Sequence, residues 1–315
     1  MTLTELKYIV AVAREKHFGH AAEACFVAQP TLSVAIKKLE DELGVVIFER
    51  GGAEISVTPL GAQIVAQAER VLQQTAAIRE IATQNKDPLA GPLRLGIIYT
   101  IAPYLLPPLV RHMIENTPQM PLVLQENFTV RLIEMLRQGE LDAAIMALPF
   151  PEQGLMVQPL YDEPFVVALP KHHPWAGRSS ISAQELKSET MLLLGNGHCF
   201  RDQVLEVCPE MSRFSTGGDG IARTFEGSSL ETIRHMVASG IGITVLPQAS
   251  VPDMQAKDGM LRYVRFEQPQ PSRRVVIAWR KSFTRSAAID AVRQAVLACD
   301  LNGATMLPEL GALET

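Results

Sequence analysis

The sequence predicts an α/β protein with an N-terminal winged helix-turn-helix, a long linker helix and a C-terminal domain of two α/β subdomains. Three patterns lead to this prediction. Short apolar helices joined by a tight connection occupy the first 44 residues, and an unbroken helical stretch runs from about residue 59 to 86. From Gly91 onward strands alternate with helices, which is typical of a mainly parallel sheet with crossover helices. A chain of 315 residues is long enough for two or three domains.

The first 44 residues contain three predicted helices. Apolar residues three and four positions apart indicate a helix over about 3–14, and a second, short helix follows over about 18–25. A tight connection leads to Pro30, which suits a first helical turn, and the third helix ends at Gly44 as a C-cap. Helix, tight turn and helix together favour a helix-turn-helix at about 18–37.

The third helix has two different faces. Its apolar stripe comprises Leu32, Ile36, Leu39 and Leu43. The opposite face suits DNA recognition, because small residues allow close approach to base edges and lysines reach phosphates. For this helix alone, a solvated face is the alternative. The candidate DNA-binding residues are Gln29, Pro30, Thr31, Ser33, Val34, Lys37 and Lys38, with Arg50 nearby.

The overall charge does not indicate DNA binding. The net charge is −5 at pH 7, and the first 60 residues hold six Lys or Arg against eight Asp or Glu. A basic footprint, the usual mark of a nucleic-acid-binding domain, is therefore missing. DNA binding has to be inferred from the local helix pattern.

After the third helix the sequence predicts a wing and a long helix. Two short apolar runs around Gly51-Gly52 indicate a hairpin. Thr58-Pro59 then supplies an N-cap and a first-turn proline, and Asp87-Pro88 ends the helix. A heptad seam along it, with no evident partner in its own domain, predicts a homodimer through residues 59–87. The seam residues are Ile64, Ala68, Val71, Thr75, Ile78 and Ala82.

The run AEACFVAQPTLSVAIKKLEDELGVVIFER closely resembles the signature of LysR-type transcriptional regulators. The resemblance covers the whole chain. It implies a winged helix-turn-helix DNA-binding domain at 1–58, a linker and dimerisation helix at 59–87, and an effector domain similar in fold to periplasmic binding proteins. It also implies promoter DNA and RNA polymerase as partners, and a homotetramer. The wing, GGAEI, departs from the pattern because it lacks the Lys or Arg that relatives often place there.

The effector part is predicted to form two subdomains around a cleft. Subdomain I covers 91–163 and 269–300, subdomain II covers 164–268, and a tail covers 301–315. Two crossings connect the subdomains, near 161–165 and near 266–272.

Hydroxyl side chains occupy several strand-to-helix positions of this part. In such sheets ligands bind beyond the carboxyl ends of the strands, often at helix N-termini. Thr100, Thr129 and Ser228-Ser229 lie at positions of that kind. A plain helix cap is the alternative for each of them, and their convergence on one cleft is implied only by the family resemblance.

Cys199 and Cys208 lie nine residues apart in a stretch that is predicted to be a helix. At ~1.5 Å per residue, a helix holds their Cα atoms about 13 Å apart. A disulfide needs these atoms roughly 4.4–6.8 Å apart. A bond between the two would therefore require the helix to refold and would act as a switch. Two unrelated buried thiols are the alternative.

Within the family, the string GHCFRDQ…C is similar to that of peroxide-sensing members. This resemblance implies that Cys199 is the peroxidatic thiol and Cys208 the resolving thiol, with hydrogen peroxide and thiol reductants as partners. A helix N-terminus or a neighbouring cation favours the reactive thiolate, and Arg201 is a second possible cation beside the histidine. The implied peroxide pocket consists of Thr100, Thr129, Gly197, His198 and Asp202.

The other cysteines and histidines carry no predicted function. Cys25 and Cys299 are expected in cores, and His172-His173 lie in a loop. The four cysteines form no CxxC and show no metal-ligand spacing with the seven histidines, so neither a metal nor a cofactor is predicted. The N-terminus lacks a signal-peptide pattern and no run of ~18 apolar residues occurs, which predicts a cytoplasmic protein without a membrane partner.

Three functions stay open at this point. The first is a transcriptional activator of oxidative-stress genes that senses hydrogen peroxide through a reversible Cys199–Cys208 disulfide. The second is a LysR-type regulator that responds to a small metabolite in the cleft, with both cysteines incidental. The third is a thiol peroxidase or oxidoreductase, which the DNA-binding pattern and the missing CxxC disfavour, so an enzyme is not predicted. A periplasmic solute-binding protein would share the cleft but needs an export signal.

Overall fold

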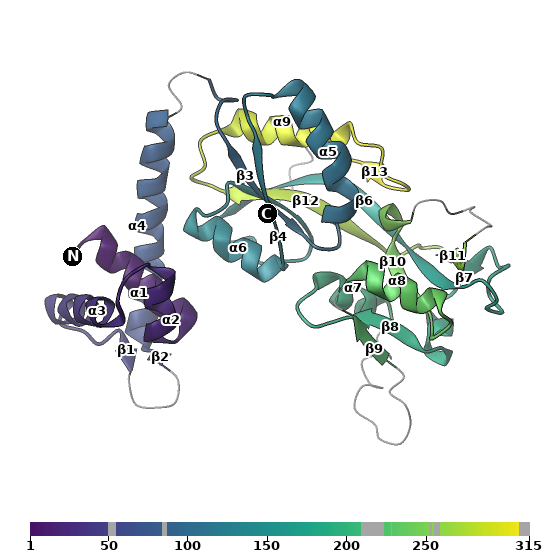
Figure 1. Ribbon diagram of the computed structural model, residues 1–315, viewed down its shortest axis with the longest axis horizontal. Helices are drawn as coiled ribbons and strands as arrows, with labels where there is room; N and C mark the ends of the chain where they lie inside the picture. Colours follow the sequence, from purple (N-terminus) through teal and green to yellow (C-terminus); the bar gives the residue numbers. More distant parts are fainter. Residues whose placement is uncertain are drawn as a thin grey trace. The chain divides into compact units, whose positions relative to one another are not determined.

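The computed structural model describes residues 1–49, 55–83, 87–208, 224–227, 229–251, 254 and 259–308. The chain forms two units, one consisting mainly of Met1–Lys86 and the other of most residues from Asp87 onward (Figure 1). The first unit is helical with a small hairpin, and the second combines a large sheet with helices. The predicted α/β class with an N-terminal helix-turn-helix is confirmed.

Three short helices form the first part of unit one. They are α1 (Leu3–Glu15), α2 (Phe18–Ala24) and α3 (Gln29–Leu43). A capping box begins α1, in which the Thr2 hydroxyl accepts from the backbone N–H of Glu5 and the Glu5 carboxylate accepts from that of Thr2. Gly44 ends α3 at φ +67°, a left-handed position that suits glycine, as predicted. Leu32, Ile36 and Leu39 are fully buried, whereas Leu43, the last residue of α3, is exposed and does not extend the stripe as predicted.

The hairpin and the linker helix complete unit one. The strands β1 (Phe48–Glu49) and β2 (Ser56–Val57) pair antiparallel, as expected for a wing, and its tip lies outside the described residues. Helix α4 (Pro59–Thr83) begins after Thr58, whose Oγ1 accepts from the N–H of Gly61 at 2.8 Å.

The heptad seam of α4 is partly covered within its own chain. Ala68 is buried in the core of unit one, and Ile64 and Val71 pack against that core. The prediction that the seam has no partner in its own domain is therefore wrong for its first half, because α1 packs along this part of α4. Ile78, further along, is exposed. Dimerisation through 59–87 stays a prediction that rests on the second half of the helix.

The sheet of unit two begins as a parallel βαβ arrangement. Strand β3 pairs in parallel with β4 and β5, and one helix connects each consecutive pair along the chain. The elements are β3 (Leu93–Ile98), α5 (Ala102–Asn116), β4 (Leu122–Asn127), α6 (Thr129–Gln138) and β5 (Ala143–Ala147).

One long strand, β6, then runs through both subdomains. Strand β6 (Leu155–Pro170) pairs with β12 (Ser272–Arg280) along its first part, and its last residues pair with β10 (Thr244–Pro247) and β11 (Leu261–Phe266). The sheet is therefore mixed, and the prediction of a mainly parallel sheet is wrong for this part. The chain leaves subdomain I along β6 and returns to it along the neighbouring β12, so these two strands are antiparallel. The predicted crossing near 161–165 lies inside β6, and that near 266–272 lies between β11 and β12.

Subdomain II surrounds the cysteine helix. Phe200 and Val204 of α7 and Cys208 just after it are buried in one core with residues of β6, β8, α8 and β10. Strands β8 and β9 form a separate parallel pair. The remaining elements are β7 (Ser180–Ile181), η1 (Ala183–Ser188), β8 (Met191–Leu194), α7 (Cys199–Val207), β9 (Thr224–Gly227), α8 (Leu230–Ala238) and η3 (Gln248–Ser250).

The C-terminal segment returns to the large sheet. Helix α9 (Ser286–Leu297) is followed by β13 (Thr305–Met306), which pairs antiparallel with β6. Arg293 of α9 donates to the carbonyls of Leu307 and Pro308 at 3.0 and 2.7 Å. Residues 301–308 are therefore part of the fold and not the tail that the sequence predicts, whereas 309–315 lie outside the described residues. Among the helices that the structure describes, none is both long and apolar enough to cross a membrane.

Candidate functional site

A small pocket lies where the ends of β3 and β4 meet the start of α7. Its lining residues are Ile98, Tyr99, Thr100, Asn127, Phe128, Thr129, Gly197, His198 and Cys199. The volume that the centre of a water molecule can occupy in this pocket is about 10 Å³. A single water needs roughly this volume. The fold thus brings together five of the residues proposed from the sequence, which come from three segments far apart in the chain. The pocket suits a very small ligand.

Thr100 is held by a buried charge network. Its Oγ1 accepts from Nη1 of Arg273 at 2.8 Å, and its carbonyl oxygen accepts from Nη2 at 3.1 Å. Nε of Arg273 donates to Glu163 at 2.7 Å, and both of these side chains are only 1% exposed. Helix α5 begins later, at Ala102, so Thr100 is not a helix cap.

Arg273 and Glu163 were not found from the sequence. Arg273 is one of two adjacent arginines in β12, and the alternation of a strand turns one of them inward and the other outward. That alternation predicts a buried arginine. It does not identify the partner, because Glu163 lies 110 positions away on β6.

Thr129 offers an unused hydroxyl to the pocket. It is the first residue of α6 and is 6% exposed. Its Oγ1 has no hydrogen-bond partner among the described residues. Leaving a buried hydroxyl unpaired costs about 1–3 kcal/mol. A small polar ligand in the pocket would recover part of that free energy.

Cys199 is the first residue of α7 and is partly buried. The N–H groups of a first helical turn have no partner within the helix, and they favour negative charge nearby. His198, the residue before the helix, is buried and makes no side-chain cap. Nη1 of Arg201 donates to the carbonyl oxygen of Leu194 at 2.8 Å, which directs this cation towards the end of β8.

Cys208 follows the last turn of the same helix and is buried. Burial raises the pKa of its thiol to about 11, so the thiol stays protonated at neutral pH while α7 is intact. Both cysteines are free thiols. Nine helical positions hold their Cα atoms about 13 Å apart. The pair can bond only after α7 has unwound.

Of the other two predicted pocket residues, Gly197 lines the pocket and Asp202 does not. Gly197 has φ +97°, and a Cβ atom there would lie 3.3 Å from the ring of Phe128, so both backbone and space favour glycine. Asp202 lies one turn into α7, is exposed and does not line the pocket. Its predicted place in the pocket is therefore not what the structure shows, because the helix carries it beyond the pocket wall.

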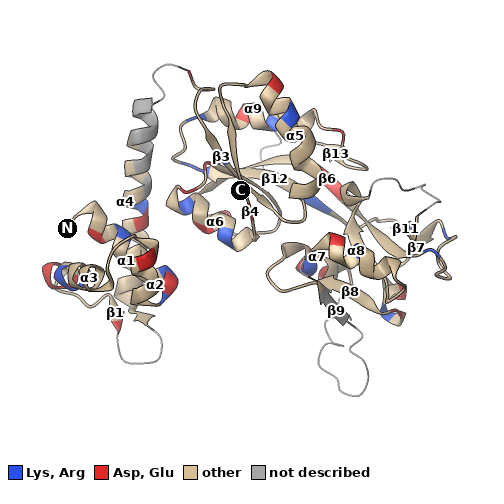
Figure 2. Ribbon diagram, in the orientation of Figure 1, with Lys and Arg blue, Asp and Glu red and all other residues tan. Residues whose placement is uncertain are grey.

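The recognition face of α3 is exposed as predicted. Val34, Lys37 and Lys38 are exposed, Ser33 is partly buried, and the first-turn residues Gln29, Pro30 and Thr31 face solvent. Exposed Val34 offers an apolar contact of the kind that reads thymine methyl groups. Acidic residues also lie on α3, in its second half (Figure 2). Arg50 lies outside the described residues.

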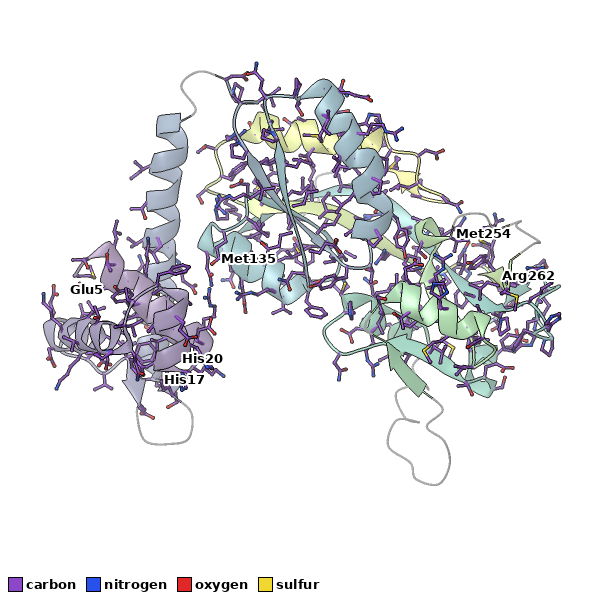
Figure 3. All side chains as sticks on the ribbon, in the orientation of Figure 1. Glu5, His17, His20, Met135, Met254 and Arg262 are labelled. Carbon is purple, nitrogen blue, oxygen red and sulfur yellow. The ribbon has the colours of Figure 1, made fainter. Side chains whose placement is uncertain are left out.

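The helix before the turn is capped by a histidine. Nδ1 of His17 accepts from the backbone N–H groups of Gly19 and His20 at 3.1 and 3.2 Å (Figure 3). This cap fixes the start of α2 and hence the geometry of the helix-turn-helix.

The family model for the bacterial regulatory helix-turn-helix protein, lysR family, matches residues 3–62, and that for the LysR substrate binding domain matches residues 86–299. The chain belongs to the LysR family of transcriptional regulators. The DNA-binding transcriptional dual regulator OxyR of Escherichia coli K12 is 38% identical over 298 residues, 95% of each chain. A full-length OxyR variant of Pseudomonas aeruginosa is 52% identical, with a TM-score of 0.70 over 96% of this chain and 99% of that one. A peroxide-bound OxyR mutant of Corynebacterium glutamicum is 33% identical, with a TM-score of 0.61 over 94% and 91%.

The remaining residues considered in the sequence of this LysR-type regulator lie outside the pocket of Cys199 or outside the described residues. The Ser229 hydroxyl accepts from the N–H of Thr232 and is a plain cap of α8, while Ser228 lies outside the described residues. Cys299 is buried as predicted, whereas Cys25 is only partly buried. Nε2 of His173 lies 3.4 Å from Glu189.

Proposed function

We propose that this LysR-type regulator senses hydrogen peroxide through a reversible Cys199–Cys208 disulfide and controls oxidative-stress genes through promoter DNA. The observation that carries the proposal is the position of Cys199, at a helix start beside an unpaired buried hydroxyl in a pocket of water size. The similarity to the OxyR of Escherichia coli and to the peroxide-bound OxyR mutant of Corynebacterium glutamicum supports the choice of ligand.

The first chemical step takes place in the pocket. The Cys199 thiolate attacks one oxygen of hydrogen peroxide, an S–O bond forms and the O–O bond breaks. The departing hydroxide takes a proton and leaves as water, and Cys199 becomes a sulfenic acid. Thr100, Thr129 and His198 are the groups that hold the peroxide oxygens in this proposal.

The second step uses the other thiol. Helix α7 unwinds, and the Cys208 thiol loses its proton and attacks the Cys199 sulfur. An S–S bond forms, the S–O bond breaks, and the hydroxyl leaves with the proton as a second water. Two thiols and one peroxide have then given one disulfide and two waters. A dithiol reductant returns both electrons and resets the pair.

Unwinding of α7 carries the signal. Phe200 lies edge-on to Phe165 with ring centroids 5.1 Å apart, and the Arg273 guanidinium lies 5.2 Å from its ring centroid. Loss of α7 removes Phe200 from these contacts and releases a core that also involves β8 and α8. The disulfide would thereby favour a second packing of the effector domain, which changes the DNA contacts.

The rest of the proposal concerns the assembly and its location. The regulator acts in the cytoplasm as a homodimer through 59–87, within a homotetramer, and activates transcription through RNA polymerase. It is not an enzyme, so the full chain consumes about one peroxide per reduction cycle and shows no sustained turnover without a reductant.

The decisive experiment is a non-reducing peptide map of the full-length reduced protein after micromolar peroxide. We expect one intrachain Cys199–Cys208 bond. Cys199→Ser should abolish the response, and Cys208→Ser should accumulate sulfenic or overoxidised Cys199. Cys25→Ser and Cys299→Ser are the matched controls and should respond normally. A map with both thiols free after peroxide would reject the proposal.

A metabolite-responsive regulator is the second candidate. A cavity of about 280 Å³ lies beside α7, and its lining includes Leu148, Phe165, Gln203 and Arg274. That volume would suit a metabolite-sized ligand. Peroxide-resistant thiols combined with normal DNA binding would favour this second candidate.

A further inference from the structure

Three aromatic rings form a continuous wall of the pocket that holds Cys199. The ring centroids of Tyr99 and Phe128 lie 5.2 Å apart, those of Phe128 and His198 4.8 Å, and those of Tyr99 and His198 5.8 Å. All three pairs meet edge to face, with interplanar angles of 64–72°, which is a favourable arrangement for aromatic rings. Each ring therefore fixes the other two.

Two of the three rings lie on the solvent side of the pocket. Tyr99 is 38% and Phe128 37% exposed, whereas Thr100, Thr129 and His198 are buried. Two of the three rings thus face water, whereas His198 and the two threonines are shielded from it. Gly197 also lies on the open side, but the ring of Phe128 packs against it so closely that a Cβ atom there would be only 3.3 Å from the ring. Tyr99 and Phe128 are therefore the large exposed side chains beside the partly buried Cys199.

The geometry points to Tyr99 and Phe128 as the residues that set which peroxides reach Cys199. The space of about 10 Å³ in the pocket is roughly what one water needs, so hydrogen peroxide, the smallest peroxide, requires the least widening of the pocket. An organic hydroperoxide such as cumene hydroperoxide carries a bulky apolar group that meets the two rings. This inference rests on the proposed function and adds a selection by size to it.

The reaction converts Cys199 to the same product with both kinds of peroxide. With an organic hydroperoxide the Cys199 thiolate attacks the terminal oxygen, an S–O bond forms, the O–O bond breaks and the alcohol leaves after taking a proton. The sulfenic acid is the same. Differences between the two leaving groups are the same in the wild type and in the variants of the rings, so a change in the preference for hydrogen peroxide reports on access past the rings.

The test compares two oxidants on the full-length reduced protein. Rate constants for loss of the Cys199 thiol are measured with hydrogen peroxide and with cumene hydroperoxide, and their ratio is the readout. The wild type should strongly prefer hydrogen peroxide. Phe128→Ala and Tyr99→Ala should reduce that preference about tenfold or more, the usual effect of opening a closely fitting apolar wall. A reduced ratio is not expected from a purely structural loss, which slows both oxidants together.

The matched control is Phe26→Ala, the same chemical change at an exposed phenylalanine of unit one that does not line the pocket. It should leave both rate constants unchanged. Phe128→Leu, with an intermediate volume, should give an intermediate ratio and carries the test if Phe128→Ala folds poorly.

Two outcomes would overturn the inference, and they differ from failure of the proposed function. An unchanged ratio in the Phe128 and Tyr99 variants, with normal reaction of the wild type, would reject only the role of the rings. A wild type that reacts equally fast with cumene hydroperoxide would do the same. A wild type that forms no disulfide with hydrogen peroxide would reject the proposed function itself.

Discussion

Two adjacent ion pairs on the same two strands show how burial decides what a charged residue contributes. Arg273 pairs with Glu163, and both side chains are 1% exposed. Arg274 pairs with Asp162, where the side chains are 41% and 33% exposed. The buried pair also holds Thr100 in the pocket and the N–H of Ala249 in η3. The outer pair is screened by water and adds little.

Glu163→Gln should therefore be strongly destabilising. It leaves the buried Arg273 guanidinium without its counter-charge, which costs about 3 kcal/mol or more. Asp162→Asn, the matched neighbour, should cost less than about 1 kcal/mol. The measurement is urea unfolding of both variants, and the compared quantity is the shift in the midpoint of unfolding of the effector domain. Equal shifts in the two variants would contradict the assigned role of the buried pair.

Among the elements, α7 is the part of the fold on which the proposed switch depends. It begins at Cys199 and ends one residue before Cys208, so its formation and the disulfide exclude each other. One hydrogen bond anchors it to the other subdomain, from Nε2 of Gln203 to the carbonyl oxygen of Leu148 at 2.8 Å, just after β5. Gln203 was not singled out from the sequence, because its acceptor is a backbone group 55 positions away.

Gln203→Met should speed disulfide formation. It removes a bond worth about 1 kcal/mol that holds α7 in its helical form, which corresponds to about a fivefold faster unwinding step. Formation of the sulfenic acid should not change, because Gln203 does not line the pocket of Cys199. Quenched-flow mapping separates the two steps, with the exposed Glu206→Gln on the same helix as control. A disulfide step as slow as in the wild type would show that this bond does not restrain α7.

At the scale of the whole molecule, charge limits how the chain can bind DNA. The net charge of −5 disfavours non-specific attraction to DNA. Affinity must then come from a few local cations, and Lys37 and Lys38 are exposed on the recognition helix. Each lysine that contacts a phosphate releases counterions and makes binding more sensitive to salt.

Lys38→Ala should weaken binding to operator and non-operator DNA by similar factors. It should also reduce the slope of log affinity against log salt by about 1, as expected for one lost phosphate contact. Fluorescence anisotropy over a salt series measures both quantities. Lys7→Ala, an exposed lysine of α1, is the control and should leave the slope unchanged. A loss confined to operator DNA would instead indicate a base contact.

Features that depend on neighbouring residues could be predicted from the sequence. Helix periodicity placed α1 to α4, caps fixed their ends at positions such as Gly44 and Thr58, and the spacing of Cys199 and Cys208 already implied that a bond requires refolding. These signals are local, because a helical turn, a cap or a spacing involves only a few successive residues.

Contacts between residues far apart in the chain became known only from the folded structure. It paired Arg273 with Glu163, ran β6 and β12 antiparallel, added β13 to the sheet and covered half of the α4 seam with α1. It also placed Tyr99 and Phe128 side by side in the lining of the pocket of Cys199, although nothing near either residue in the sequence indicates the other. The physical reason is that burial and pairing depend on which strands and helices pack together, and that is set by the whole chain.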